Sequence, residues 1–264
     1  MSAAVWRKSI AQALRHTGLE AGEVRPLLQA ALGVDRAFLA AHDDEQLSPG
    51  QAVAYSAFVE RRKTGEPVAY ILGKREFYGL NFKVTPAVLI PRPETELLVE
   101  LALPRIPKNK SCRVLDLGTG CGNIAVALAH YRPLAQITAV DASSAALEVA
   151  EQNAGNLLGG GHLIHFQCSD WFASVDGEKF DLIVSNPPYV AASDPHLQQG
   201  DLRFEPRQAL RASGYGLECI KHIVNNASRH LHRGGWLLFE HGYDQAAACR
   251  NLRSPWLPRC RSAT

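Results

Sequence analysis

The feature that most constrains this chain is a glycine-rich segment, DLGTGCG at 116–122, which lies between a short apolar run and a predicted helix. The run Val114–Leu115 predicts a buried strand, and residues 123–130 predict the helix that follows. Glycine adopts positive φ without steric cost and lets the backbone approach a ligand closely. A strand, a glycine turn and a helix in this order are typical of a doubly wound α/β sheet that binds a nucleotide-containing ligand.

The alternation of strand and helix continues as far as residue 239. Further strands are expected at 137–140, 163–166, 181–184 and 236–239, with helices at 144–153 and about 217–231. Strands that alternate with helices predict a mostly parallel sheet covered by helices on both faces. The sequence therefore predicts the α/β class, with a Rossmann-like sheet, for this part of the chain.

The first 75 residues predict a different unit, built only from short helices. Their apolar residues recur at helical spacing, and Gly18 and Gly33 follow two of the predicted helices. Residues 76–93 then begin with strand-like residues, and their prolines exclude a long helix. We therefore divide the chain into a helical domain at 1–75, a connector or hairpin at 76–93, and an α/β domain at 94–264.

The composition excludes several classes of protein. The 28 Lys and Arg against 26 Asp and Glu leave a net charge of +2, which gives no electrostatic reason to expect a nucleic-acid or membrane partner. No apolar run approaches the roughly 18 residues of a membrane-spanning helix, and the N-terminus does not resemble a signal peptide. The six cysteines form no C-x-x-C pair, which predicts neither a zinc site nor a disulfide framework. We expect a cytoplasmic protein without a metal.

Two acidic residues near the glycine loop favour a cationic ligand. Dinucleotide enzymes use G-x-G-x-x-G, whereas this loop reads G-x-G-x-G with Asp116 two residues before Gly118. A carboxylate there repels a pyrophosphate but attracts the sulfonium and ammonium groups of S-adenosyl-L-methionine. Asp141 ends the next predicted strand, where it can accept hydrogen bonds from ribose hydroxyls. This part of the sequence therefore favours S-adenosyl-L-methionine, with NAD as the alternative.

A further acidic position, Asp170, follows the third predicted strand of the sheet, in the segment SDWF at 169–172. Its carboxylate can accept a hydrogen bond from an adenine amino group, and the ring of Trp171 can cover the base. The alternative interpretation is a polar turn beside a core tryptophan. Both residues are therefore candidates for the adenine end of the ligand.

The most specific motif is NPPY at 186–189, which directly follows the predicted strand at 181–184. Its two prolines fix the backbone, so the Asn186 side-chain oxygen and the Pro187 carbonyl can face one point. These two acceptors can bind both hydrogens of a planar NH2 group, while Tyr189 offers a ring face for stacking. Catalysis of methyl transfer to such a nitrogen then rests on orientation and desolvation, without a strong base or a metal.

Together these residues resemble the release factor glutamine methyltransferases, the HemK/PrmC family, over about residues 5–245. The resemblance is carried by REFY at 75–78, LIPRPETE at 89–96, DLGTGCG at 116–122, SDWF at 169–172, SNPPYV at 185–190, and a segment that ends in DLRFEP at 201–206. NPPY alone also fits DNA adenine methyltransferases. The LIPRPETE and DLRFEP segments make the resemblance specific.

The resemblance implies a class I methyltransferase fold behind a helical N-terminal domain, and we expect that domain to dock the protein substrate. It also implies methyl transfer from S-adenosyl-L-methionine to the glutamine side-chain nitrogen in the GGQ motif of peptide chain release factors 1 and 2. The residues implied for the cofactor are Asp116, Gly118, Thr119, Gly120, Cys121, Gly122, Asp141, Asp170, Trp171 and Asn186. Those implied for the glutamine are Asn186, Pro187, Pro188 and Tyr189, with Asn186, Pro187 and Tyr189 as the catalytic set and with Arg92 and Glu94 near the mouth of the site.

The C-terminal end departs from the family pattern. From residue 246 onward the chain includes two late prolines and predicts no strands. We therefore expect the sixth and seventh strands of the family to be absent, the C-terminal β-hairpin to be incomplete, and a sheet edge to be exposed. Two alternatives to the methyltransferase of release factors stay open: a DNA or RNA amino methyltransferase, and a release-factor-binding protein impaired in catalysis by this C-terminus.

Overall fold

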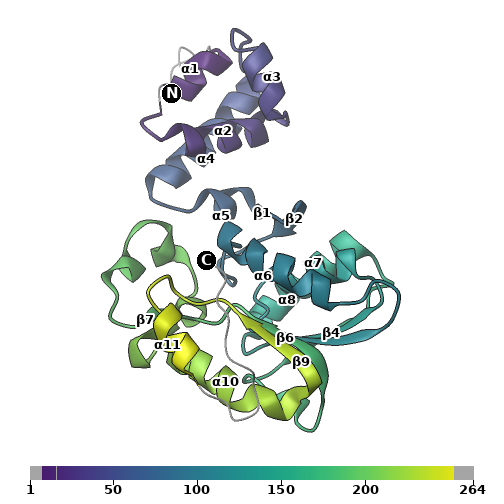
Figure 1. The fold of residues 1–264 in the computed structure, drawn as a ribbon. Coiled ribbons are helices and arrows are strands. Elements are labelled where there is room, and N and C mark those ends of the chain that lie inside the picture. Colours follow the sequence, from purple (N-terminus) through teal and green to yellow (C-terminus); the bar gives the residue numbers. More distant parts are fainter. Residues whose placement is uncertain (1–7, 16, 253–264) are drawn as a thin grey trace. The chain divides into compact units, whose positions relative to one another are not determined.

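The computed structural model of the chain describes residues 8–15 and 17–252 (Figure 1). Contacts divide the chain into two compact units, Met1–Gly73 and Lys74–Thr264. The boundary lies close to residue 75, where the sequence predicts the end of the helical domain. Each unit has a separate hydrophobic core, and each is therefore stabilised chiefly by its own buried apolar side chains.

The first unit is helical, as its periodicity predicts. Its helices are α1 (Ile10–Arg15), α2 (Ala21–Leu32), α3 (Arg36–Ala41), α4 (Pro49–Lys63) and α5 (Val68–Leu72). The Ser48 hydroxyl accepts the backbone N–H of Gln51 and caps α4, while Gly33 ends α2 in the left-handed conformation. Val24 and Leu28 of α2 are fully buried in the core of this unit. The pattern of apolar residues therefore selects the faces that pack together.

A β-hairpin opens the second unit. Strands β1 (Lys74–Phe77) and β2 (Leu80–Lys83) pair in antiparallel fashion, and Tyr78 and Gly79 form the turn with positive φ. The hairpin is attached to the body of this unit through Asn153, whose side chain exchanges hydrogen bonds with the Lys83 backbone at 2.7 and 3.0 Å. The same Asn153 amide donates to the Cys121 carbonyl, which links the hairpin to the end of the glycine loop.

The central sheet of the described residues is parallel. Its strands are β3 (Cys112–Leu117), β4 (Ala135–Asp141), β5 (Ile164–Cys168), β6 (Phe180–Ser185) and β9 (Leu231–Phe239), in the order β5-β4-β3-β6-β9. The chain adds strands in one direction from β3 to β5 and then returns to the other side of β3 with β6. Ligands of doubly wound sheets bind at such a reversal, beyond the carboxyl ends of the strands. The predicted Rossmann-like sheet is therefore confirmed.

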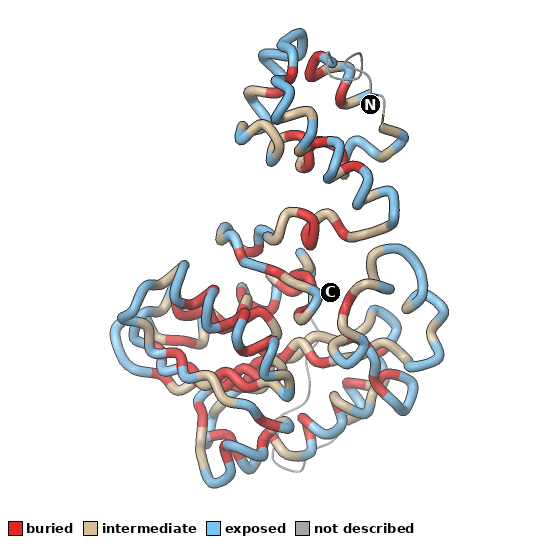
Figure 2. Tube along the Cα trace, turned by 180° about the vertical axis from the view of Figure 1, so that it is seen from behind, coloured by how far each residue is buried: buried red, intermediate tan, exposed pale blue. Residues whose placement is uncertain are grey.

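Helices cover both faces of this sheet. One face packs on α6 (Glu96–Ala102), α7 (Asn123–Tyr131) and α8 (Ser144–Leu158), and the other packs on α10 (Glu218–His230). Alternate residues of a strand point to opposite faces, so Val114 lies in the first core and Leu115 in the second. Buried residues therefore follow the strands and the helix faces turned toward them, as Figure 2 shows.

Short elements surround the carboxyl ends of the strands. They include the two-residue strands β7 (Val190–Ala191) and β8 (Arg211–Ala212), which pair in parallel, together with helices α9 (Arg207–Leu210) and α11 (Ala246–Asn251). No sequence pattern predicts the pair of β7 and β8, because a strand of two residues is too short to show periodicity. The tail at 253–264, to which the predictions of missing strands and an exposed edge refer, lies outside the described residues. Within the described part, no helix combines the length and apolarity needed to span a membrane.

Candidate active site at the carboxyl ends of the strands

The glycine loop follows β3 and is held against the next strand of the sheet. The backbone N–H groups of Gly118 and Thr119 both donate to the Val140 carbonyl at 2.9 Å. Gly118 and Gly120 have positive φ, and a Cβ on either would meet no protein atom within 4 Å. This side of the loop is therefore open to a ligand that approaches the backbone closely.

Gly122 has a different reason to be glycine. A Cβ at this position would lie 3.1 Å from the Cβ of Ala150 in α8, and its φ is +81°. The residue therefore lets α7 begin close to α8, which is a packing role. Thr119 and Cys121 are also buried and, like Gly122, do not line the cavity beside the loop.

Asp141 ends β4 and receives two backbone hydrogen bonds. Its Oδ2 accepts the N–H of Gly120 and its Oδ1 accepts the N–H of Ser143, each at 2.9 Å. Burial raises the pKa of this carboxyl group, and the backbone hydrogen bonds oppose that shift. Each oxygen retains a second lone pair, so the carboxylate can accept from neighbouring ribose hydroxyls as its position predicts.

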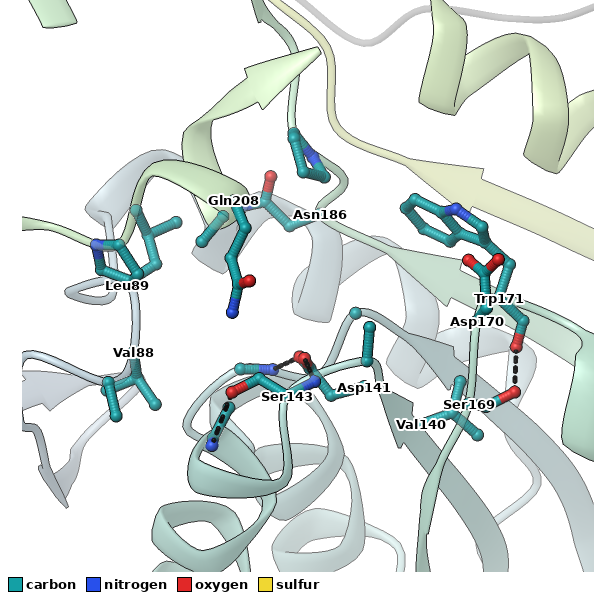
Figure 3. A pocket seen from close by; sticks show the side chains of 18 residues that line it. Val88, Leu89, Val140, Asp141, Ser143, Ser169, Asp170, Trp171, Asn186 and Gln208 are labelled. Carbon is teal, nitrogen blue, oxygen red and sulfur yellow. Dashed lines mark hydrogen bonds between the residues drawn. The ribbon is translucent and has the colours of Figure 1, made fainter.

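A cavity, here called the first cavity, opens between these groups. Its lining residues include Val88, Leu89, Gly118, Gly120, Val140, Asp141, Ser143, Asp170, Trp171, Asn186, Pro188 and Gln208. In Figure 3, Asp170 and Trp171 lie on the opposite side of it from Val88 and Leu89, with Asp141 and Ser143 between them. A flat apolar wall beside a carboxylate and an open glycine backbone suits a nucleoside.

Trp171 adopts a backbone conformation that is uncommon for a residue with a side chain. Its φ is +51°, and the Ser169 hydroxyl donates to its carbonyl oxygen at 2.9 Å. The indole packs against the second core of the sheet and lines the first cavity at the same time. Trp171 is therefore part of a polar turn, packs against the core and also lines the cavity.

Asp116 lies behind the glycine loop and is fully buried. The Thr119 hydroxyl donates to its Oδ2 at 2.7 Å, whereas its Oδ1 has no hydrogen-bond partner among the described residues. Burial raises the pKa of Asp116 to about 7. An unsatisfied buried carboxylate oxygen next to an open loop fits a ligand that brings positive charge.

The NPPY motif follows β6, as the sequence predicts. The Ser185 hydroxyl at the end of β6 donates to the Leu117 carbonyl at 2.8 Å, which fixes the motif beside the glycine loop. The Asn186 Nδ2 then donates to the Thr95 hydroxyl oxygen at 3.0 Å. No described residue donates a hydrogen bond to the Asn186 side-chain oxygen or to the Pro187 carbonyl. Both acceptors therefore remain for a ligand.

Another cavity, here called the second cavity, adjoins the motif. It is lined by Leu89, Arg92, Asn186, Pro187, Tyr189, Val190, Leu202, Ala209 and Leu210. Asn186, Leu89 and Ala209 also line the first cavity, so the two cavities meet at these side chains. The Tyr189 hydroxyl donates to Glu240 at 2.8 Å, and burial together with that carboxylate raises the pKa of Tyr189 well above its usual range. Tyr189 is therefore a neutral wall of the second cavity.

Arg92 and Glu94, which the resemblance places near the mouth of the site, do not pair with each other. Arg92 instead binds Glu205, a fully buried carboxylate in the DLRFEP segment whose other oxygen accepts the Ile90 N–H at 3.0 Å. These two contacts compensate the cost of burying the Glu205 carboxylate. The ion pair also joins two segments that are 113 residues apart in the sequence. Glu94 is exposed and lines neither cavity.

Sequence reasoning overlooked several residues of the site: Val88, Leu89, Thr95, Glu205, Gln208 and Glu240. Two segments that contain such residues, LIPRPETE and DLRFEP, were singled out as motifs. Their pairing was not visible, because partners separated by more than about 90 residues leave no periodic signal.

A doubly wound parallel sheet with an open glycine loop, an acid at the end of the neighbouring strand and an NPPY motif defines a class I methyltransferase. The family described as "Methyltransferase small domain" matches residues 94–241, and the "PrmC N-terminal domain" matches residues 6–73. The chain belongs to the release factor glutamine methyltransferase family, as its relatives show.

Three of the relatives that carry the name "Release factor glutamine methyltransferase" show the extent of the similarity. The protein from Burkholderia pseudomallei is 51% identical over 246 residues, which cover 92% of this chain and 86% of that protein. The Xylella fastidiosa protein is 49% identical over 89% of this chain and 84% of its own length. The Escherichia coli protein is 48% identical over 85% of this chain and 80% of its own length.

Among solved structures, a ribosomal protein L11 methylase from Lactobacillus delbrueckii aligns with a TM-score of 0.44 at 25% identity, over 61% of this chain and 67% of that one. A SAM-dependent methyltransferase from Agrobacterium tumefaciens aligns with a TM-score of 0.49 at 18% identity, over 68% and 56%.

Proposed function

We propose that this chain methylates the side-chain amide nitrogen of the glutamine in the GGQ motif of peptide chain release factors 1 and 2, with S-adenosyl-L-methionine as the methyl donor. The observation that carries the proposal is the meeting of the two cavities at Asn186. A donor in the first cavity and a carboxamide in the second cavity would face each other across this one side chain. The names of the relatives support the protein substrate.

The residues of the first cavity fit the cofactor. Asp141 would bind the ribose hydroxyls, Trp171 and Asp170 would contact the adenine, and the backbone of Gly118 and Gly120 would lie along the methionine part. Asp116 would compensate its positive charge from behind the loop. S-adenosyl-L-methionine supplies an electrophilic methyl carbon on a sulfonium, and S-adenosyl-L-homocysteine is the product that leaves.

The residues of the second cavity would bind and orient the glutamine. The Asn186 Oδ1 and the Pro187 carbonyl would each accept one hydrogen of the substrate NH2 group, because both are unused within the described part of the chain. Holding both hydrogens of the substrate amide would aim the nitrogen lone pair toward the first cavity. It would also reduce the conjugation of that lone pair with the substrate carbonyl. Tyr189 and Leu89 would exclude water, and the nitrogen would lose a proton to solvent after transfer.

The N-terminal unit is the part that we propose docks the release factor, since a tripeptide offers little surface for affinity. Its core contains no residue of the catalytic unit, so residues 1–73 can be removed without opening the core around the sheet. Removal should raise KM for intact release factor while kcat on a short GGQ peptide stays the same. An unchanged KM for intact release factor would exclude a docking role.

The activity is tested by incubating the chain with release factor and S-adenosyl-L-methionine and analysing the tryptic GGQ peptide by mass spectrometry. We expect the addition of one CH2 group on the glutamine and no addition when that glutamine is replaced by alanine. A duplex and a single-stranded oligonucleotide serve as competing substrates. Methylated adenine with an unmodified GGQ peptide would instead identify a nucleic-acid amino methyltransferase, and cofactor binding without any transfer would identify a catalytically impaired binding protein.

A further inference from the structure

Glu240 follows β9 and contacts two residues at the back of the second cavity. Its Oε2 accepts the Thr95 hydroxyl at 2.7 Å, and its Oε1 accepts the Tyr189 hydroxyl at 2.8 Å. Thr95 is 1% exposed, so its hydroxyl has no access to bulk water. The carboxylate therefore connects Thr95, 145 residues earlier in the sequence, with Tyr189 of the NPPY motif, 51 residues earlier.

The direction of these hydrogen bonds is fixed by chemistry. An ionised carboxylate only accepts hydrogen bonds, so Thr95 must spend its single hydroxyl hydrogen on Glu240. The Thr95 oxygen can then only accept, and the group of Asn186 that faces it must be the NH2 group, 3.0 Å away. The Asn186 Oδ1 is consequently the free end of the amide. A carboxylate two hydrogen bonds away thus decides how this amide is oriented.

We propose that Glu240 is a positioning residue for methyl transfer, which acts through Thr95 to keep the Asn186 oxygen turned toward the substrate nitrogen. The proposal rests on the proposed function, in which this oxygen accepts a hydrogen of the glutamine NH2 group. If the Asn186 amide were rotated by 180°, its NH2 group would face the NH2 group of the substrate glutamine. Both groups are hydrogen-bond donors, so no hydrogen bond could form between them. The orientation of the Asn186 side-chain amide therefore decides whether the site binds the substrate NH2 group or repels it.

The segment that contains Glu240 also holds the backbone of the motif. Gln245 is buried, accepts the Gly242 N–H at 2.9 Å, and donates from Nε2 to the Tyr189 carbonyl at 3.0 Å. The residues just beyond β9 thus contact Tyr189 through its side chain and through its main chain. The loop that begins at Glu240 is therefore attached to the motif at Glu240 and again at Gln245.

The test compares three substitutions in the full chain. Glu240→Gln has the same size but adds a donor, so Thr95 can accept from it and donate to Asn186, which permits the amide to turn over. Thr95→Val removes the hydroxyl at nearly constant shape, whereas Thr95→Ser keeps it. We expect the first two to lower kcat about 100-fold with small changes in KM and in the Kd for S-adenosyl-L-methionine, and Thr95→Ser to retain most of the activity.

The double variant Thr95→Val with Glu240→Gln separates a relay from two independent effects. If Glu240 acts through Thr95, the second substitution adds little to the first, because the chain of hydrogen bonds is already broken. Tyr189→Phe removes only the hydrogen bond between Tyr189 and Glu240, so its effect on kcat measures the contribution of that contact. Additive losses, or a Thr95→Ser variant as slow as Thr95→Val, would overturn the proposal.

A spectroscopic measurement tests the relay without catalysis. In protein labelled with 15N-asparagine, the Asn186 side-chain pair is assigned by its loss in Asn186→Asp. One hydrogen of this pair should exchange slowly with solvent in the wild type and in Thr95→Ser, and quickly in Thr95→Val and Glu240→Gln. Unchanged exchange in both variants would refute the relay. If the wild type methylates no release factor, the proposed function fails, and this signal still decides the relay.

Discussion

The two cavities that meet at Asn186 are built from the chain in different ways. In the first cavity, the contacts that hold Asp141 are local: its carboxylate accepts the N–H of Ser143, two residues away, and that of Gly120, at a separation of 21 residues. The second cavity depends on contacts between Asn186 and Thr95, and between Thr95 and Glu240, at separations of 91 and 145 residues. Cofactor binding should therefore depend on the loops after β3 and β4, whereas acceptor binding depends on the complete fold of the domain.

The largest expected effect lies where the cavities meet. Replacing Asn186 by Ala removes the proposed acceptor for one substrate hydrogen, and we expect kcat/KM for release factor to fall by about 10²–10³-fold, as for loss of one preorganised group in other active sites. The Kd for S-adenosyl-L-methionine, measured by calorimetry, should change far less. Equal losses of transfer and of cofactor affinity would contradict the division between the two cavities.

The next effect belongs to the first cavity alone. Asp141→Asn replaces a carboxylate that accepts two backbone N–H groups by an amide that can accept only through one oxygen. We expect the Kd for S-adenosyl-L-methionine to rise by about 10–100-fold, since hydrogen bonds to charged groups contribute about 1.5–3 kcal/mol. At saturating cofactor, kcat should approach the wild-type value. A kcat that stays low under saturation would show that Asp141 also shapes the second cavity.

A pair of glycine substitutions tests the dependence of the second cavity on packing. A Cβ at Gly216 would overlap the Tyr189 carbonyl and lie 2.6 Å from the Gln245 Nε2, whereas one at Gly177 would meet no atom within 4 Å. Both glycines have φ near +80°, so Gly177→Ala serves as the control for backbone strain. We expect Gly216→Ala to lower the free energy of unfolding by about 1–3 kcal/mol more than the control, in thermal melts. If both variants lost the same free energy of unfolding, the overlap with Tyr189 would not be the cause of the destabilisation.

The smallest effect is a pH dependence on the side of the first cavity. Because burial raises the pKa of Asp116 from 3.8 to about 7, its contribution to stability is complete below about pH 4 and is lost as the pH rises toward 7. A cationic ligand favours the ionised form, so S-adenosyl-L-methionine should bind up to about tenfold more weakly at pH 6 than at pH 8. Asp116→Asn should show neither pH dependence, in melts or in calorimetry.

Much of the fold could be predicted from the sequence. The strands at 112–117, 135–141, 164–168, 180–185 and 231–239 each contain or overlap a predicted run, because buried parallel strands are short, apolar and bounded by turns. The glycine loop and Asp141 could be placed for the same reason, since chain order fixes them at adjacent strand ends. Motif residues such as Asn186 also line the predicted site.

The partners of those residues could not be predicted. No local pattern predicts that Arg92 binds Glu205, a contact that forms because the DLRFEP segment packs on the residues around Arg92 and buries its carboxylate there. Nor does a local pattern predict that Gly122 lies against Ala150 of α8. Both contacts join segments that are far apart in the sequence.

The sequence by itself determined the class of this protein: helical periodicity, the strand–glycine–helix turn and the NPPY motif are local patterns whose physical meaning survives without coordinates. The tertiary structure decided which end of Asn186 is free, because that depends on the hydroxyl of Thr95 and the carboxylate of Glu240. Hydrogen-bond direction is set by the partner at each step, and these partners become neighbours only when the sheet and its loops are folded.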